Sequence, residues 1–87
     1  MDKEDRLHKM HQGLSNVVKD GGWNMRQTSV AEGGTLTFQI FDIGDRFVVV
    51  RISSDAITVR NTTVKASADA DFDHQKVHAL IDEALKA

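Results

Sequence analysis

Three strand-like segments follow one another closely between residues 35 and 64, and they constrain the fold most. β-Branched and aromatic residues dominate the segments 35–41, 46–52 and 56–60, and short turn sequences join them. Links this short force neighbouring strands to run antiparallel. The middle segment is apolar at both alternating sets of positions, so both faces of the sheet should be shielded from water. Two helices on one face account for only half of this shielding, which predicts a partner on the other face.

Helical periodicity flanks the strand region on both sides. Residues 3–20 repeat apolar side chains at helical spacing, and Gly21-Gly22 is typical of a helix end. A second helix is predicted over residues 72–85. Its expected N-cap is Asp71, and Asp73 adds favourable negative charge in the first turn.

The remaining segments complete the sheet. Residues 24–31 indicate a weaker edge strand, and Glu32-Gly33-Gly34 is typical of a hairpin loop. Residues 61–69 are polar, and they either extend the last strand or begin the crossing to the final helix. We therefore predict an α+β two-layer sandwich of order α-β-β-β-β-α. Its four-stranded antiparallel sheet carries the N-terminal and C-terminal helices on one face.

Length and composition exclude several classes of protein. The 87 residues make one domain, 1–87. The absence of cysteine excludes disulfides and thiol chemistry. No apolar run approaches the roughly 18 residues of a membrane span, and the N-terminus is charged, so we expect no membrane association and a cytoplasmic location. The net charge of −2 argues against a general nucleic-acid binder.

Strand alternation assigns side chains to the two faces of the sheet. One set, which includes Phe38, Val50 and Ile57, is assigned to the core beneath the helices. The opposite set mixes aromatic, aliphatic and arginine side chains, the types enriched at the centres of protein interfaces. The partner contacts predicted there are Phe41, Phe47, Val49, Arg51 and Arg60. Two alternatives stay open: strand twist, a bulge or a long loop covers the two phenylalanines, or the chain forms a homodimer through this face or an edge strand.

Acidic residues gather toward the C-terminus. Residues 66–87 contain five acidic side chains and two lysines, a local charge of −3. An acidic helix beside an arginine-bearing sheet can steer the approach of a partner, although a solvated helix face is the simpler interpretation. The predicted acidic contacts are Asp71, Asp73, Asp82 and Glu83.

Candidate chemistry is sparse. His74, His78 and Asp82 are spaced four apart, which places them on one helix face, as metal ligation by a helix requires. No glutamate follows His74 and no distant ligand is evident, so a solvated polar face is favoured and no metal is expected. Asp42, Asp45 and Asp55 fall in predicted turns, where aspartate commonly bonds its own backbone.

No motif indicates catalysis. The serines lack a nucleophile elbow, and the glycine pairs lack the residues of a phosphate-binding loop. We therefore expect no catalytic residue, no cofactor and no enzymatic activity.

The segment 14–23, Leu-Ser-Asn-Val-Val-Lys-Asp-Gly-Gly-Trp, resembles the helix–Gly-Trp–strand opening of small HicA-type messenger-RNA interferase toxins. The resemblance covers about ten residues. It implies a fold similar to a double-stranded-RNA-binding domain. The histidine that this family carries in its early strand region has no counterpart between Gln27 and Phe41, so nuclease activity is not carried over.

These observations favour a small non-enzymatic protein-interaction module, a regulator or inhibitor of the antitoxin-like or phage-inhibitor type. It would bind a larger protein, whose identity the sequence does not give, through the sheet face and the acidic C-terminal helix. The alternative is a nucleic-acid-binding domain that uses arginines on the sheet, with binding that weakens steeply as salt rises. These arginines are Arg26, Arg46, Arg51 and Arg60.

Overall fold

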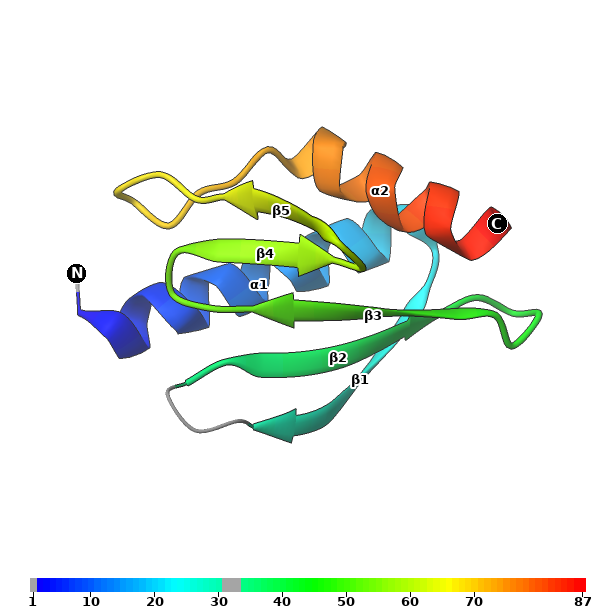
Figure 1. The fold of residues 1–87 in the computed structure, drawn as a ribbon, viewed down its shortest axis with the longest axis horizontal. Helices are drawn as coiled ribbons and strands as arrows, with labels where there is room; N and C mark the ends of the chain where they lie inside the picture. Colours follow the sequence, from blue (N-terminus) through cyan, green and yellow to red (C-terminus); the bar gives the residue numbers. More distant parts are fainter. Residues whose placement is uncertain (1, 31–33) are drawn as a thin grey trace.

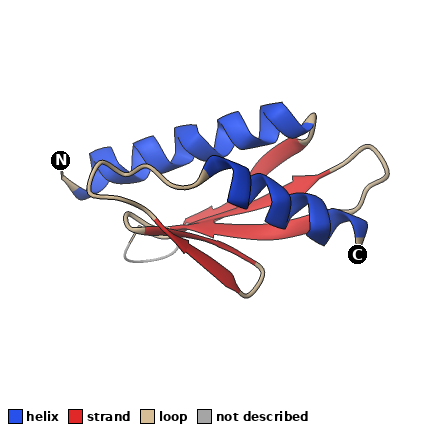
Figure 2. Ribbon diagram, turned by 90° about the horizontal axis from the view of Figure 1, so that it is seen from above, coloured by secondary structure: helices blue, strands red, loops and turns tan. Residues whose placement is uncertain are grey.

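Two helices cover one face of a five-stranded antiparallel sheet (Figures 1 and 2). The computed structural model describes residues 2–30 and 34–87. The helices are α1 (Lys3–Gly21) and α2 (His74–Lys86). The strands follow one another across the sheet in chain order: β1 (Asn24–Val30), β2 (Leu36–Phe41), β3 (Phe47–Ile52), β4 (Ala56–Val59) and β5 (Thr62–Lys65). Neither helix combines the length and the apolar character needed to cross a membrane, within the described ranges.

The predicted α+β architecture is confirmed: the chain has an antiparallel sheet, an N-terminal helix and a C-terminal helix. The prediction of four strands is wrong. Residues 62–65 form a fifth strand that pairs with β4. Arg60 takes a left-handed φ of 55° in the two-residue connection, a conformation suited to the twist of a tight hairpin. The strand escaped prediction because only Val64 is buried, while its three polar neighbours are exposed. One apolar residue makes no alternating pattern.

Helix α1 lies close to its predicted bounds. The Asp2 carboxylate caps it by accepting a hydrogen bond from the Asp5 N–H at 2.8 Å. Gly22 ends it in the left-handed conformation, and its N–H donates to the Lys19 carbonyl. The predicted edge strand is β1, and it carries a bulge between Gln27 and Ser29. The predicted hairpin loop at residues 32–34 lies, except for its last glycine, outside the described residues.

Helix α2 begins later than predicted, at His74 rather than at Phe72, and its N-cap is Asp73 rather than Asp71. The physical reason is the packing of Phe72 on helix α1. A Cβ built at Gly13 would lie 2.7 Å from the Phe72 ring, so the missing side chain makes room for the ring. This contact fixes the segment ahead of α2 in a non-helical path.

The hydrophobic core lies between the helices and the sheet. The face assignment made from alternation is confirmed on the core side, where the strands contribute buried aliphatic and aromatic side chains. Leu36, which alternation also assigns to this face, is only partly buried. The buried strand residues of this set are Phe38, Ile40, Val48, Val50, Ile52, Ile57 and Val59.

Arg6 ties three parts of the chain together near the start of α1. Its side chain is 15% exposed, and it donates hydrogen bonds to the backbone carbonyls of Ser54, Ser67 and Ala68. The guanidinium also lies 3.4 Å from the Asp55 carboxylate. A single cation thereby holds the β3–β4 turn and the segment between β5 and α2 against helix α1.

Candidate functional site

The sheet face turned away from both helices is the candidate site, and we call it the open face. Both helices lie on the other side of the sheet, so no other described helix or strand covers this face (Figure 2). Strand register and alternation place the following side chains on it: Arg26, Thr37, Gln39, Phe41, Phe47, Val49, Arg51, Thr58 and Thr63.

One end of the open face is aromatic. Phe41 and Phe47 are direct cross-strand partners of β2 and β3. Phe47 is 57% exposed, whereas Phe41 is half-buried. Arg26 donates to the side-chain carbonyl of Gln39 at 2.8 Å beside them. Together with Asp45 these residues line a shallow hollow of about 410 Å³. The hollow offers an aromatic surface next to an oriented guanidinium.

The middle of the open face is a polar row. Arg51 on β3 pairs with Thr37 on β2 and with Thr58 on β4. The Thr58 hydroxyl lies 3.1 Å from the hydroxyl of Thr63, which continues the row onto β5. Arg51 is exposed, and no ion pair reaches it from any described residue. The row therefore presents a solvated guanidinium flanked by hydroxyl groups.

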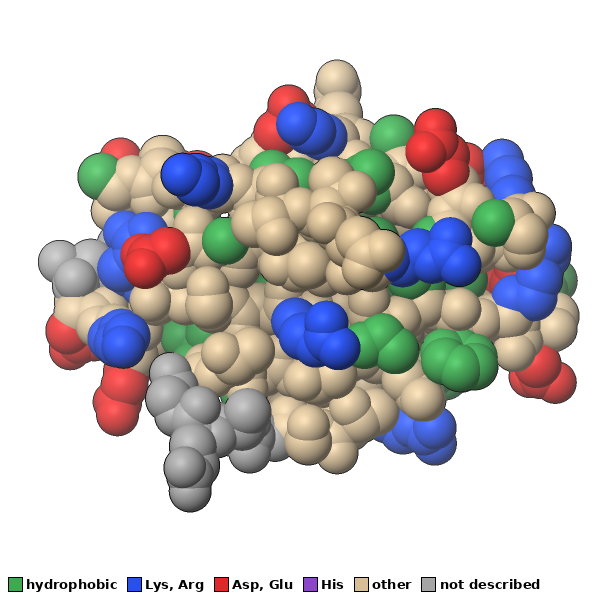
Figure 3. Space-filling view, in the orientation of Figure 1, with side chains coloured by type: hydrophobic (Ala, Val, Ile, Leu, Met, Phe, Trp, Pro, Cys, Tyr) green, Lys and Arg blue, Asp and Glu red, His purple; other side chains and the backbone are tan. Residues whose placement is uncertain are grey.

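The open face has a positive character although the whole chain has a net charge of −2. The five strands contain Arg26, Arg51 and Lys65 but no aspartate or glutamate. Figure 3 shows basic, hydrophobic and uncharged side chains across the middle of this face, with the acidic side chains toward its rim. The acidic side chains seen from this side therefore lie around the open face rather than on its strands.

The predicted sheet contacts fall in two places. Phe47 and Arg51 are exposed on the open face, and Val49 lies half-buried between them. Strand twist and the bulge leave Phe47 accessible, since the described residues cover less than half of it. Arg60 instead lies in the β4–β5 turn at the rim, where it lines a groove of about 520 Å³ with Glu83 of α2.

The other predicted acidic contacts are engaged within the chain. Asp71 lies 3.4 Å from the Lys9 ammonium, and Asp82 pairs with Lys86 at 2.9 Å. The Asp73 carboxylate accepts the Lys76 N–H at 3.1 Å as the cap of α2. Of the four predicted acidic residues, Glu83 is the one that the structure brings near a predicted sheet contact.

The cap role of Asp73 gives a test that separates the effect of its capping hydrogen bond on stability from the effect of its charge. Asp73→Ala is expected to lower the free energy of unfolding by about 1 kcal/mol, because it leaves a first-turn N–H without its acceptor. Asp73→Asn keeps a capping oxygen without the charge and should cost only a few tenths. Urea denaturation of the two variants measures the difference. Equal losses would show that the charge of Asp73, not its cap, matters.

The histidine row is divided among separate partners. His74 Nε2 lies 2.7 Å from an Asp20 carboxylate oxygen, and the His78 ring packs on Trp23 with centroids 4.9 Å apart. Within residues 2–30 and 34–87 no three histidine or carboxylate groups converge as metal ligands. These histidines therefore join helix α2 to helix α1 and to Trp23, two residues beyond the end of α1.

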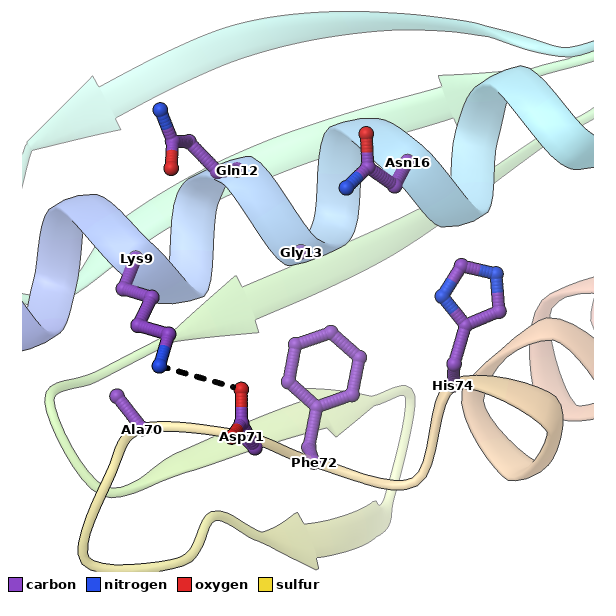
Figure 4. Close-up of a pocket in the computed structure, with 8 residues that line it drawn as sticks. All are labelled: Lys9, Gln12, Gly13, Asn16, Ala70, Asp71, Phe72 and His74. Atoms are coloured by element: carbon purple, nitrogen blue, oxygen red, sulfur yellow. Dashed lines mark ion pairs between the residues drawn. The ribbon is translucent and has the colours of Figure 1, made fainter.

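A groove of about 370 Å³ separates α1 from the segment that precedes α2 (Figure 4). Lys9 reaches across it to Asp71, and the same ammonium donates to the Asp69 carbonyl at 2.7 Å. Phe72 lies against Gly13, and His74 lies at the far end, already paired with Asp20. The charged groups along the groove thus have partners within the chain, and these contacts hold the two segments together.

The β2–β3 turn contains Asp42, a predicted turn residue, and also an exposed apolar residue that was not predicted from the sequence. Asp42 accepts the N–H groups of Gly44 and Arg46 at 2.8 and 3.2 Å, as expected for a turn residue. Ile43, at the tip of this β2–β3 turn, is 98% exposed. An apolar residue between turn-forming aspartate and glycine was the available signal. Its position extends the apolar surface beyond Phe47.

Comparison with protein-family models, with curated proteins and with solved structures finds no match to this chain. The choice of the open face as the candidate site therefore rests on its geometry alone.

Proposed function

We propose that this chain is a small non-enzymatic protein-binding module, a regulator or inhibitor that docks its open face on a larger protein. The observation that carries the proposal is the exposed Phe47 on a sheet face whose strands contain no acidic residue and which also presents Arg51. A module of this kind acts by occupying a surface of its target, in the manner of an antitoxin or a phage-encoded inhibitor.

The side chains on the open face suit this role energetically. Burying the exposed parts of Phe47 and Val49 would remove apolar area from water, a gain of about 25 cal/mol per Å². Aromatic residues and arginine carry most of the binding energy at protein interfaces, often about 2 kcal/mol or more for each dominant residue. Ile43 and the groove formed by Arg60 and Glu83 extend the contact at two margins.

Site-specific photocrosslinking tests the proposal. A photoreactive amino acid at Thr63, which is exposed on the open face, is expected to give a covalent adduct with one protein in native lysate. The same group at Gln12, which is exposed on helix α1, serves as the matched control and should give none. Mass spectrometry of the adducts identifies the partner. Adducts from Gln12 alone, or from neither position, would refute docking through the sheet.

A second candidate function is binding of single-stranded nucleic acid on the same face. The observation that favours it is the combination of Arg26 and Arg51 with an exposed phenylalanine, because bases stack on aromatic rings while arginines meet phosphates. Arg46, the third strand-region arginine of this candidate, pairs with Asp42 at 3.3 Å, and this contact offsets part of its charge. The net charge of −2 favours the protein partner.

A further inference from the structure

Charge on the open face points to the chemistry of its partner. The strands supply basic residues without a single acidic one. The carboxylates of Asp71 and Asp73, in the segment ahead of α2, bond to α1 and α2 on the helix side. Arg51 and Arg60 have no ion-pair partner among the residues that the structure describes. The open face therefore carries positive charge that its own chain leaves uncompensated.

The surroundings of Arg51 are suited to a carboxylate. A guanidinium binds a carboxylate through two parallel N–H···O bonds, and this geometry distinguishes arginine from lysine. Thr37 and Thr58 flank Arg51 on the neighbouring strands, and their hydroxyl groups are additional donors. A carboxylate set on this row would meet donors from three strands.

The apolar residues next to Arg51 narrow the chemistry of the partner further. Phe47 and Val49 precede Arg51 on β3, and Phe41 lies opposite Phe47, so the basic row borders an apolar area. A protein surface offers carboxylates and apolar side chains side by side. A nucleic-acid strand would add a continuous line of phosphates, which the net charge of −2 disfavours.

Resting on the proposed function, we infer that the partner is an acidic protein surface, with aspartate or glutamate carboxylates on Arg51 and an apolar side chain beside Phe47. Arg60 at the rim meets a further carboxylate. Electrostatic attraction of this kind mainly speeds association and is weakened by salt.

Fluorescence anisotropy with defined probes tests this inference. The probes are a labelled peptide of alternating glutamate and leucine, its lysine–leucine counterpart, and labelled oligothymidylate. The glutamate peptide is expected to bind, and Arg51→Gln should weaken it about tenfold, Arg51→Glu about a hundredfold, since like charges in an interface repel. Lys19→Glu, an equal charge change on exposed helix α1, should leave the affinity within about twofold.

Each other outcome overturns the inference. Equal binding of both peptides, absence of binding, or an unchanged affinity for Arg51→Glu would contradict an acidic partner. Binding of oligothymidylate without the glutamate peptide would assign the face to nucleic acid. If the peptide fails while Thr63 still crosslinks a protein, only the acidic partner is refuted. If both fail, the proposed function falls as well.

Discussion

Arg6→Ala is expected to lower the free energy of unfolding by about 2 to 3 kcal/mol, because one side chain serves three backbone carbonyls from two separate segments. A hydrogen bond to a charged group contributes about 1.5 to 3 kcal/mol, and part of this is lost to solvent because two of the three bonds are exposed. A domain of this size has a total stability of only about 4 to 13 kcal/mol. The substitution thus removes a large share of it.

Urea denaturation measures this loss, with the fluorescence of Trp23 as the probe. Arg6→Lys keeps the charge but not the planar fork, so its loss should fall between those of alanine and wild type. Lys3→Ala, on the exposed first turn of the same helix, should stay within about 0.5 kcal/mol of wild type. If Arg6→Ala unfolded at the same urea midpoint as the wild type, the hydrogen bonds of Arg6 would add no stability.

The core of this fold was predictable because its signals are local and repetitive. Alternation placed Phe38, Val50 and Ile57 on the buried face, and helical spacing with terminal glycines located α1 within a residue or two. Strand β5 lacked such a signal, since Val64 is its only buried residue. The start of α2 depended on Phe72 meeting Gly13, a contact between residues far apart in the chain.

The open face was predictable only in part, because some of its features depend on turns and on contacts between residues far apart in the chain. Period two identified Phe47, Val49 and Arg51 as neighbours on one side of β3. It could not place Arg60, because the left-handed φ of this residue ends the alternation at the turn. Nor could it reveal that Asp71 is paired with Lys9, since an ion pair between residues 62 positions apart leaves no pattern in the sequence. Tertiary contacts therefore decided which acidic residues have an ion-pair partner within the chain.

The double substitution Phe47→Ala and Arg51→Ala is expected to weaken binding of the crosslinked partner about a hundredfold or more. Truncating two dominant interface residues of these types commonly costs about 2 kcal/mol each, although the effects are not strictly additive. Both side chains are exposed in the isolated chain, so neither fills the core. The free energy of unfolding should therefore change by less than about 1 kcal/mol.

Isothermal titration of this partner with the wild type, the Phe47/Arg51 double variant and a Gln12/Lys19 double alanine variant measures how far binding depends on the sheet. We expect the sheet variant to lose the binding heat while it unfolds at nearly the wild-type urea concentration, and the helix variant to bind as the wild type does. Wild-type affinity in a folded Phe47/Arg51 variant would contradict docking through the open face.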